Sequence, residues 1–278
     1  MSKTIISVKN LVKNYGEFAA VKDISFDVYE GEIFGLLGPN GAGKSTTLEI
    51  IETLRSKTSG KVFVDGFDLD KEPDSIKKII GVQLQTSGYY PGLKLKELIS
   101  LFSGLYNTRV DPQELLRLVN LTISKDEAEK LKDPGLVKTE RRRILDKDKS
   151  NAKYKDLSGG QKQRFSVATT LINQPKIIFL DEPTTGLDPQ ARRNLWELIK
   201  EIRSKGATVI ITTHYMDEAE QLCDRIAIMD EGRIISLNSP DKMIDDLVST
   251  GFERPKQVKA ANLEDVFIHL TGKEMRDE

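Results

Sequence analysis

The sequence predicts a mixed α/β fold, because short apolar runs of strand length alternate with helical segments along most of the chain. These predicted strands lie at residues 4–8, 24–29, 32–37, 61–65, 78–83, 176–181, 207–213 and 225–229, each bounded by turn-forming residues. From residue 32 onward, helical segments separate the runs, which is typical of parallel β-α units. The early runs lie close together, and the short connection at 30–32 predicts antiparallel neighbours there.

The composition is that of a globular protein with a core of its own. The chain has 278 residues, of which 38% are hydrophobic and 31% charged, so neither a disulfide nor a structural metal is needed for stability. Cys223 is the single cysteine and only two histidines occur, which excludes an internal disulfide and a zinc-type cluster. The net charge of −1 gives no overall attraction for nucleic acid or anionic lipid.

The sequence contains no candidate membrane span. No apolar run approaches the roughly 18 to 20 residues that cross a bilayer, and the N-terminal residues do not form a secretory apolar region. We therefore expect the chain itself to stay in the cytosol. A membrane partner is compatible with this expectation, because a peripheral subunit needs no spanning segment.

Helix starts are well marked between and beyond the predicted strands. Asp111-Pro112 and Asp188-Pro189 each supply an N-cap followed by proline at the first helical position. Residues 93–175 are predicted to be mainly helical and to form a subdomain inserted into the α/β core. Within it, residues 122–153 are rich in both charges and include three consecutive arginines, which predicts a solvated segment.

A phosphate-binding loop follows the predicted strand at 33–37. It consists of Gly38, Pro39, Asn40, Gly41, Ala42, Gly43, Lys44 and Ser45, and Thr46 opens the helix after it. This is the eight-residue P-loop pattern in its strand-to-helix context, where backbone N–H groups converge on phosphate oxygens. Lys44 is predicted to reach the β and γ phosphates and Ser45 to ligate Mg²⁺. The alternative is a glycine-rich turn without a ligand.

Two carboxylates, Asp181 and Glu182, stand at the end of the apolar strand predicted at 176–181. In parallel sheets ligands bind at the carboxyl ends of strands, so Asp181 is predicted to help hold Mg²⁺ from outside its direct ligands. Glu182, the next residue, is placed to accept a proton from an attacking water. This is the Walker B pattern; the alternative is that both acids cap the following turn.

The segment Leu157 to Gln161 carries the most discriminating motif. Ser158 as N-cap and Gln161 three residues on form a capping box, but a capping box does not explain the adjacent Gly159 and Gly160, which weaken helix initiation by about 1 kcal/mol each. Bare backbone there suits the close approach of an anion. With this motif the chain resembles the ATP-binding subunits of ABC transporters, whose signature motif has these residues.

The resemblance covers nearly the whole chain and implies a fold in detail. It implies a P-loop NTPase (RecA-like) core at residues 1–92 and 176–240, which includes an N-terminal antiparallel β subdomain. It further implies that residues 93–175 form the inserted helical subdomain and that residues 241–278 form a C-terminal helical tail.

The resemblance also implies roles for residues outside these three motifs. Tyr15 matches the aromatic residue that stacks on adenine; the alternative is a core aromatic of an edge strand. Gln85 matches the glutamine that touches Mg²⁺ and the attacking water, with Gln83 as a second candidate. Asp188 matches the loop that meets the opposite subunit and is also a plausible helix N-cap. His214 matches the histidine that contacts the γ-phosphate.

The family resemblance implies that two subunits enclose two ATP molecules. The P-loop of one copy and the Ser158–Gln161 segment of the other form each site, Glu182 activates water, and a separate transmembrane permease couples closure to transport. The expected location is the inner face of the cell membrane, with no nucleic acid partner. One alternative is a member of the same superfamily that acts on nucleic acid or ribosomes. Another is a P-loop GTPase or a small-molecule kinase, but this class would leave the Ser158–Gln161 segment unexplained.

Two further segments are left with open interpretations. Residues 261–272 are similar to the tail of ATPases that serve two-gene exporters; the alternative is an amphipathic closing helix. The stretch 122–153 makes the distance between Gln85 and Ser158 longer than this group would suggest. It is either a solvated hairpin, begun by a capping box at Ser124, or a contact for the permease, a regulator or anionic headgroups through Arg141 to Arg143.

Overall fold

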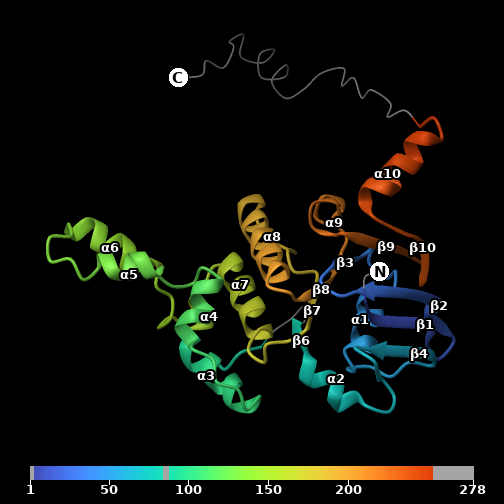
Figure 1. Cartoon of the computed structure of the whole chain (residues 1–278), viewed down its shortest axis with the longest axis horizontal. Coiled ribbons are helices and arrows are strands. Elements are labelled where there is room, and N and C mark those ends of the chain that lie inside the picture. Colours follow the sequence, from blue (N-terminus) through green and yellow to red (C-terminus); the bar gives the residue numbers. More distant parts are fainter. Residues whose placement is uncertain (1–2, 84–87, 253–278) are drawn as a thin grey trace, which may run out of the picture. The chain divides into compact units, whose positions relative to one another are not determined.

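The computed structural model describes residues 3–83 and 88–252 (Figure 1). It consists of two units, Met1–Asp241 and Lys242–Glu278, and the candidate site lies in the first. The second unit contains most of helix α10 (Pro240–Ser249). Gln85, His269 and the tail at 261–272 lie outside the described residues.

The N-terminal part of the chain forms a four-stranded antiparallel sheet. Its order is β2-β1-β4-β5, and the strands are β1 (Thr4–Tyr15), β2 (Phe18–Tyr29), β4 (Ser59–Val64) and β5 (Phe67–Asp68). Strands β1 and β2 form a hairpin around Gly16, whose φ is 58°. Both strands are longer than the sequence predicts. Lys9 and Asn10 interrupt the apolar pattern of β1 after Val8, and Lys22 and Asp23 separate the first residues of β2 from the predicted run at 24–29.

A second, six-stranded sheet forms the centre of the first unit. Its order is β10-β9-β3-β8-β7-β6, with β10 (Arg233–Asn238), β9 (Arg225–Asp230), β3 (Ile33–Leu37), β8 (Thr208–Thr213), β7 (Ile177–Asp181) and β6 (Ile80–Gln83). Strands β9, β3, β8, β7 and β6 are parallel, and β10 is antiparallel to β9. The predicted mixed α/β fold is confirmed.

The prediction of antiparallel neighbours across residues 30–32 is wrong. After β2 the chain leaves the first sheet, and β3 joins the second, where it pairs in parallel with β8 and β9. The physical reason is burial: every residue of β3 is buried, and strands covered on both faces occupy central positions in parallel sheets.

Helices flank and connect these strands. Those in the core are α1 (Lys44–Ile51), α2 (Pro73–Ile79), α8 (Pro189–Ser204) and α9 (Met216–Leu222). Between β6 and β7 the chain forms α3 (Leu95–Leu105), α4 (Pro112–Leu118), α5 (Lys125–Lys130), α6 (Lys138–Lys147) and α7 (Gly159–Thr170). Figure 1 shows this helical region, green to yellow, gathered on one side of the second sheet.

Among the described residues, no helix combines the length and apolar character needed to cross a membrane.

The charged stretch folds into a hairpin of α5 and α6. The predicted capping box at Ser124 is confirmed, since its hydroxyl accepts the Glu127 N–H and the Glu127 carboxylate accepts the Ser124 N–H. Arg141 donates from its guanidinium to the carbonyls of Leu131, at 3.0 Å, and Asp133, at 2.9 Å. Arg141 is therefore used within the hairpin, which leaves the two arginines after it as the exposed ones.

Candidate active site

The strand register brings the sequence motifs to one edge of the second sheet. Leu37 of β3 lies beside Thr213 of β8, and Asp181 of β7 lies beside Thr212. Asp181 is the last residue of β7, and the P-loop, Glu182 and His214 each follow directly from the carboxyl end of one of these strands. Carboxyl ends of parallel strands are where such sheets bind ligands.

The P-loop presents an uncapped helix start. Gly43 is the N-cap of α1 in a left-handed conformation, with φ of 96°, and no side chain caps the helix. The first N–H groups of α1 are therefore available to an anion, which the helix dipole also favours. Packing also requires glycine at position 38, because a Cβ there would lie 2.1 Å from the Met229 carbonyl oxygen.

Lys44 is buried beneath this loop. Its Nζ donates to the carbonyl oxygens of Gly38, at 2.8 Å, and Pro39, at 3.0 Å, and lies 3.9 Å from Glu182 Oε1. Burial lowers the pKa of Lys44, and the nearby Glu182 and Asp181 carboxylates partly oppose that shift. The loop thus holds a desolvated cation next to the free N–H groups, an arrangement that suits a polyphosphate.

Ser45 and Asp181, from two motifs far apart in sequence, are in direct contact. Ser45 Oγ donates to Asp181 Oδ1 at 3.1 Å, and Thr212 Oγ1 donates to the same oxygen. Within the described ranges no three His, Cys, Asp or Glu side chains form a metal-binding group. A hydroxyl and a carboxylate oxygen nevertheless fit Mg²⁺, which takes oxygen ligands and commonly shares them with substrate phosphates and water.

Glu182 sits in a strained backbone position beside Lys44. Its φ of 47° lies in the left-handed region, which is uncommon for a residue with a side chain. The Glu182 N–H donates to Thr212 Oγ1 at 2.9 Å, and Thr185 Oγ1 donates to Glu182 Oε2 at 3.1 Å. His214 Nδ1 lies 3.3 Å from the same Oε2, without a hydrogen bond.

These residues surround a hollow of about 600 Å³, here called the P-loop hollow. Its lining comprises Tyr15, Phe18, Ala20, Asn40, Gly41, Gly43, Lys44, Ser45, Thr46, Glu182, Thr185 and His214. Tyr15 is 41% exposed, so it is not a core aromatic, and the cations of Lys13 and Arg55 lie 5.0 and 5.4 Å from its ring.

Sequence reasoning missed three residues of this hollow, Phe18, Ala20 and Thr185. Phe18 pairs with Tyr15 across the hairpin turn and is 65% exposed, so the two aromatic rings flank the same hollow. Thr185 contacts Glu182 as described above. The sequence signal available for Phe18 was an aromatic residue three positions after Tyr15. The sequence contained no comparable signal for Thr185.

The signature residues lie in a separate hollow of about 310 Å³, here called the signature hollow. It is lined by Ser158, Gly159, Gly160, Gln161, Arg164, Gly186, Leu187, Asp188, Ala191 and Asn194. The predicted capping box is confirmed, with Ser158 N–H donating to Gln161 Oε1 at 3.0 Å. Asp188 caps α8 by accepting the Ala191 N–H at 2.8 Å.

Packing between two helices explains why residue 160 of the signature segment is glycine. A Cβ on Gly160 would lie 3.0 Å from Ala191 Cβ, so a bare backbone allows α7 to approach α8. Of the two glutamines considered in the sequence, Gln83 is 3% exposed at the end of β6, and Gln85 lies outside the described residues.

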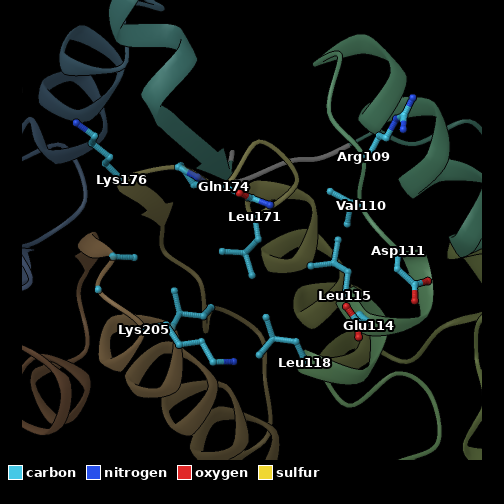
Figure 2. Close-up of a pocket in the computed structure, with 14 residues that line it drawn as sticks. Arg109, Val110, Asp111, Glu114, Leu115, Leu118, Leu171, Gln174, Lys176 and Lys205 are labelled. Carbon is cyan, nitrogen blue, oxygen red and sulfur yellow. The ribbon is translucent and has the colours of Figure 1, made fainter.

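A third hollow, of about 610 Å³, contains none of the predicted site residues (Figure 2). It lies at the opposite, amino ends of β7 and β8, where Lys176 and Ala207 precede those strands. Figure 2 shows leucines of α4 and the α7 end lining it, with the charged ends of Arg109 and Lys176 pointing away from its centre. Its position excludes it as the site of the phosphate chemistry.

Comparison with known proteins agrees with this geometry. The ABC transporter family model matches residues 21–185. The chain is 32% identical to Nod factor export ATP-binding protein I of Burkholderia orbicola, with all of both chains covered. It is 37% identical to linearmycin resistance ATP-binding protein LnrL of Bacillus subtilis, covering 84% of this chain and 69% of that one.

Solved structures show the same fold. A dimeric ATP-binding cassette in a post-hydrolysis state, bound to ADP and phosphate, aligns with a TM-score of 0.67 and 28% identity, covering 84% of this chain and 98% of that one. A dimeric bacterial ABC transporter cassette aligns with a TM-score of 0.67 and 30% identity over the same shares.

Proposed function

Because this chain belongs to the ABC transporter family of ATPases, we propose that two copies close around two ATP molecules and power a separate membrane permease. The relatives are named for Nod factor export and for linearmycin resistance, which favours a transporter ATPase over an ATPase that acts on nucleic acid or ribosomes. We place the chain at the inner membrane face through its permease, as an exporter.

The single observation that carries this proposal is the separation of the two hollows. The P-loop hollow holds the phosphate cradle and Glu182, whereas the signature hollow holds Ser158 and its neighbours. One chain therefore offers two half-sites. A second copy can complete each of them, and dimeric cassettes among the structural neighbours support such pairing.

The chemical groups at the P-loop hollow fit ATP and Mg²⁺. The uncapped start of α1, the buried Lys44 ammonium and the Ser45–Asp181 contact supply N–H groups, a cation and oxygen ligands. We propose that Ser45, Asp181 and Gln85 hold Mg²⁺, which when bound neutralises phosphate charge. Tyr15 would stack on the adenine.

The protein's own groups suggest how water is activated. We propose that Glu182 accepts the proton of the attacking water at its carboxylate, while Thr185 and the backbone bond to Thr212 hold that side chain in place. Lys44 and His214 would stabilise the negative charge that develops on the γ-phosphate. Ser158, Gly159, Gly160 and Gln161 of the opposite copy would bind the same phosphate, and Asp188 would lie at that contact.

Two substitutions test this assignment. Glu182→Gln should slow hydrolysis by about 10²- to 10⁴-fold while ATP still binds, because the amide cannot take a proton but fills the same space. Lys44→Ala should lose binding, because the cradle loses its cation. Phosphate release and equilibrium titration with a nucleotide analogue measure both effects.

The paired outcome separates chemistry from binding. In Glu182→Gln, ATP should accumulate in a dimer of twice the monomer mass, seen by light scattering. Wild-type turnover in Glu182→Gln would remove Glu182 as the base, and unchanged affinity in Lys44→Ala would remove the P-loop as the nucleotide site.

A further inference from the structure

The imidazole of His214 lies beside the proposed base without a hydrogen bond that would orient it there. Its Nδ1 is 3.3 Å from Glu182 Oε2 and is buried with no hydrogen-bond partner among the described residues. Because His214 follows β8 directly, the strand end fixes its backbone, but not the direction of its ring. Packing against neighbouring side chains is therefore the contact that can orient the ring.

The aromatic ring of Tyr215 packs against this imidazole. The centres of the two rings are 4.1 Å apart, and their planes are inclined by 39°. The Tyr215 N–H donates to Thr213 Oγ1 at 3.0 Å, which closes a short turn at the end of β8. The turn holds the backbone of Tyr215, so the Tyr215 ring limits the positions that the His214 ring can take.

Arg192 of α8 contacts the Tyr215 ring in turn. Its guanidinium carbon lies 4.4 Å from the centre of that ring, and its Nη1 donates to Asp217 Oδ2 of α9 at 3.2 Å. A guanidinium this close to an aromatic ring is attracted by the ring electrons. Two contacts thus tie the start of α8 to the turn and the helix that follow β8.

The surroundings of Arg192 confine its guanidinium to this place. Its side chain is 20% exposed, and its Nε is buried without a hydrogen-bond partner in the described part of the chain. Burying an unpaired donor of a charged group costs free energy, and the Tyr215 ring and the Asp217 carboxylate offset that cost in this orientation. The backbone N–H of Arg192 donates to the Asp188 carbonyl at 2.9 Å, which anchors the residue in the first turn of α8.

We propose that Tyr215 is a positioning residue that, held by Arg192, keeps the His214 imidazole beside Glu182. The proposal rests on the role that the proposed function gives to His214. Catalysis is sensitive to small misplacements of the groups that act on the substrate. Loss of the Tyr215 ring therefore slows the chemical step through His214 and leaves nucleotide binding by the P-loop in place.

The test measures kcat for ATP hydrolysis and affinity for ADP in the full chain. Tyr215→Leu should lower kcat about tenfold, with affinity for ADP within about twofold of wild type, because ADP lacks the γ-phosphate on which His214 acts. Tyr215→Phe should keep most of the rate, because it retains the ring that packs against the histidine. Wild-type kcat in Tyr215→Leu overturns the proposal, and so does a Tyr215→Phe rate as low as that of Tyr215→Leu.

A double variant asks whether Tyr215 acts through His214. His214→Ala should itself lower kcat, and Tyr215→Leu added to it should lower kcat no further. A second tenfold loss in the His214→Ala background would show that Tyr215 acts by another route and overturns the proposal. Wild-type kcat in His214→Ala removes the histidine from the mechanism and overturns the proposal with it, whereas the ATPase assignment is decided separately by Glu182→Gln.

Arg192→Ala tests the support of the ring while leaving the ring in place. It should lower kcat about two- to fivefold, with affinity for ADP unchanged, and should have no effect in the His214→Ala background. Arg193→Ala is the matched control, since Arg193 is the next residue of α8 and is exposed, and it should behave as wild type. Where Tyr215→Leu does not fold, wild-type kcat in Arg192→Ala overturns the proposal.

Discussion

At the scale of single residues, Glu182 shows how position and chemistry are combined. Its left-handed backbone, φ 47°, costs on the order of 1 kcal/mol or more, and the hydrogen bond from its N–H to Thr212 Oγ1 helps to hold it. Two acids at the end of an apolar run are readable in the sequence. The sequence does not reveal the turn that separates Glu182 from Asp181 or the contacts of Thr185 and Thr212, because these features depend on residues up to 30 positions away.

Glu52 is a second buried carboxyl, at the end of α1. It is 2% exposed, and among the described residues its Oε1 has no hydrogen-bond partner. Burial raises the pKa of Glu52 to about 8, with further contributions from the Asp181 and Glu49 carboxylates. The folded chain therefore favours the protonated form.

This shift predicts how stability depends on pH. A carboxyl with a raised folded pKa contributes stability below its unfolded pKa of about 4.5, and that contribution is lost as pH rises towards about 8. Glu52→Gln cannot ionise, so its free energy of unfolding should gain on wild type by on the order of 4 kcal/mol between these limits. Denaturant unfolding at pH 5, 7 and 8.5 measures the difference.

The matched control is Glu197→Gln, whose side chain is 75% exposed on α8. Its difference from wild type should stay small across the series. A constant difference for Glu52→Gln at all three pH values would show that Glu52 ionises normally in the folded chain.

At the scale of elements, local signals were predictable and sheet membership was not. The N-caps at Asp111, Ser124, Ser158 and Asp188 form as predicted, because a cap involves residues only two or three positions apart. The crossing from β2 into the second sheet, and the edge strand β10, depend on distant partners. A short connection is compatible with either a hairpin or a change of sheet, so spacing alone misled.

The hairpin of α5 and α6 offers a test at this scale. Arg141→Ala should loosen the hairpin, because it removes two charged hydrogen bonds to the carbonyls of Leu131 and Asp133, worth about 1 to 3 kcal/mol. Hydrogen exchange of the amides at 125–147 should quicken accordingly, with the ATPase rate unchanged.

Arg142→Ala is the matched control, since Arg142 is exposed and should leave exchange as in wild type. Equal exchange in the Arg141→Ala and Arg142→Ala variants would show that the two carbonyl contacts do not stabilise the hairpin.

At the scale of the whole molecule, most of the site follows from the order of motifs. Strands β3, β7 and β8 end at one edge, so residues that follow them meet there whatever the loops do. That rule places Lys44, Asp181 and His214 together. It does not predict Phe18, which reaches the site through the hairpin of β1 and β2.

The central claim is that each working site needs two chains. The most direct measurement is the rate of ATP hydrolysis per chain against protein concentration, with the molecular mass followed by light scattering in the same samples, for wild type and Ser158→Arg. We predict that the wild-type rate per chain falls in step with dissociation of the dimer, and that Ser158→Arg binds nucleotide with unchanged affinity but does not turn over. A rate per chain that stays constant where the protein is a monomer would contradict the account.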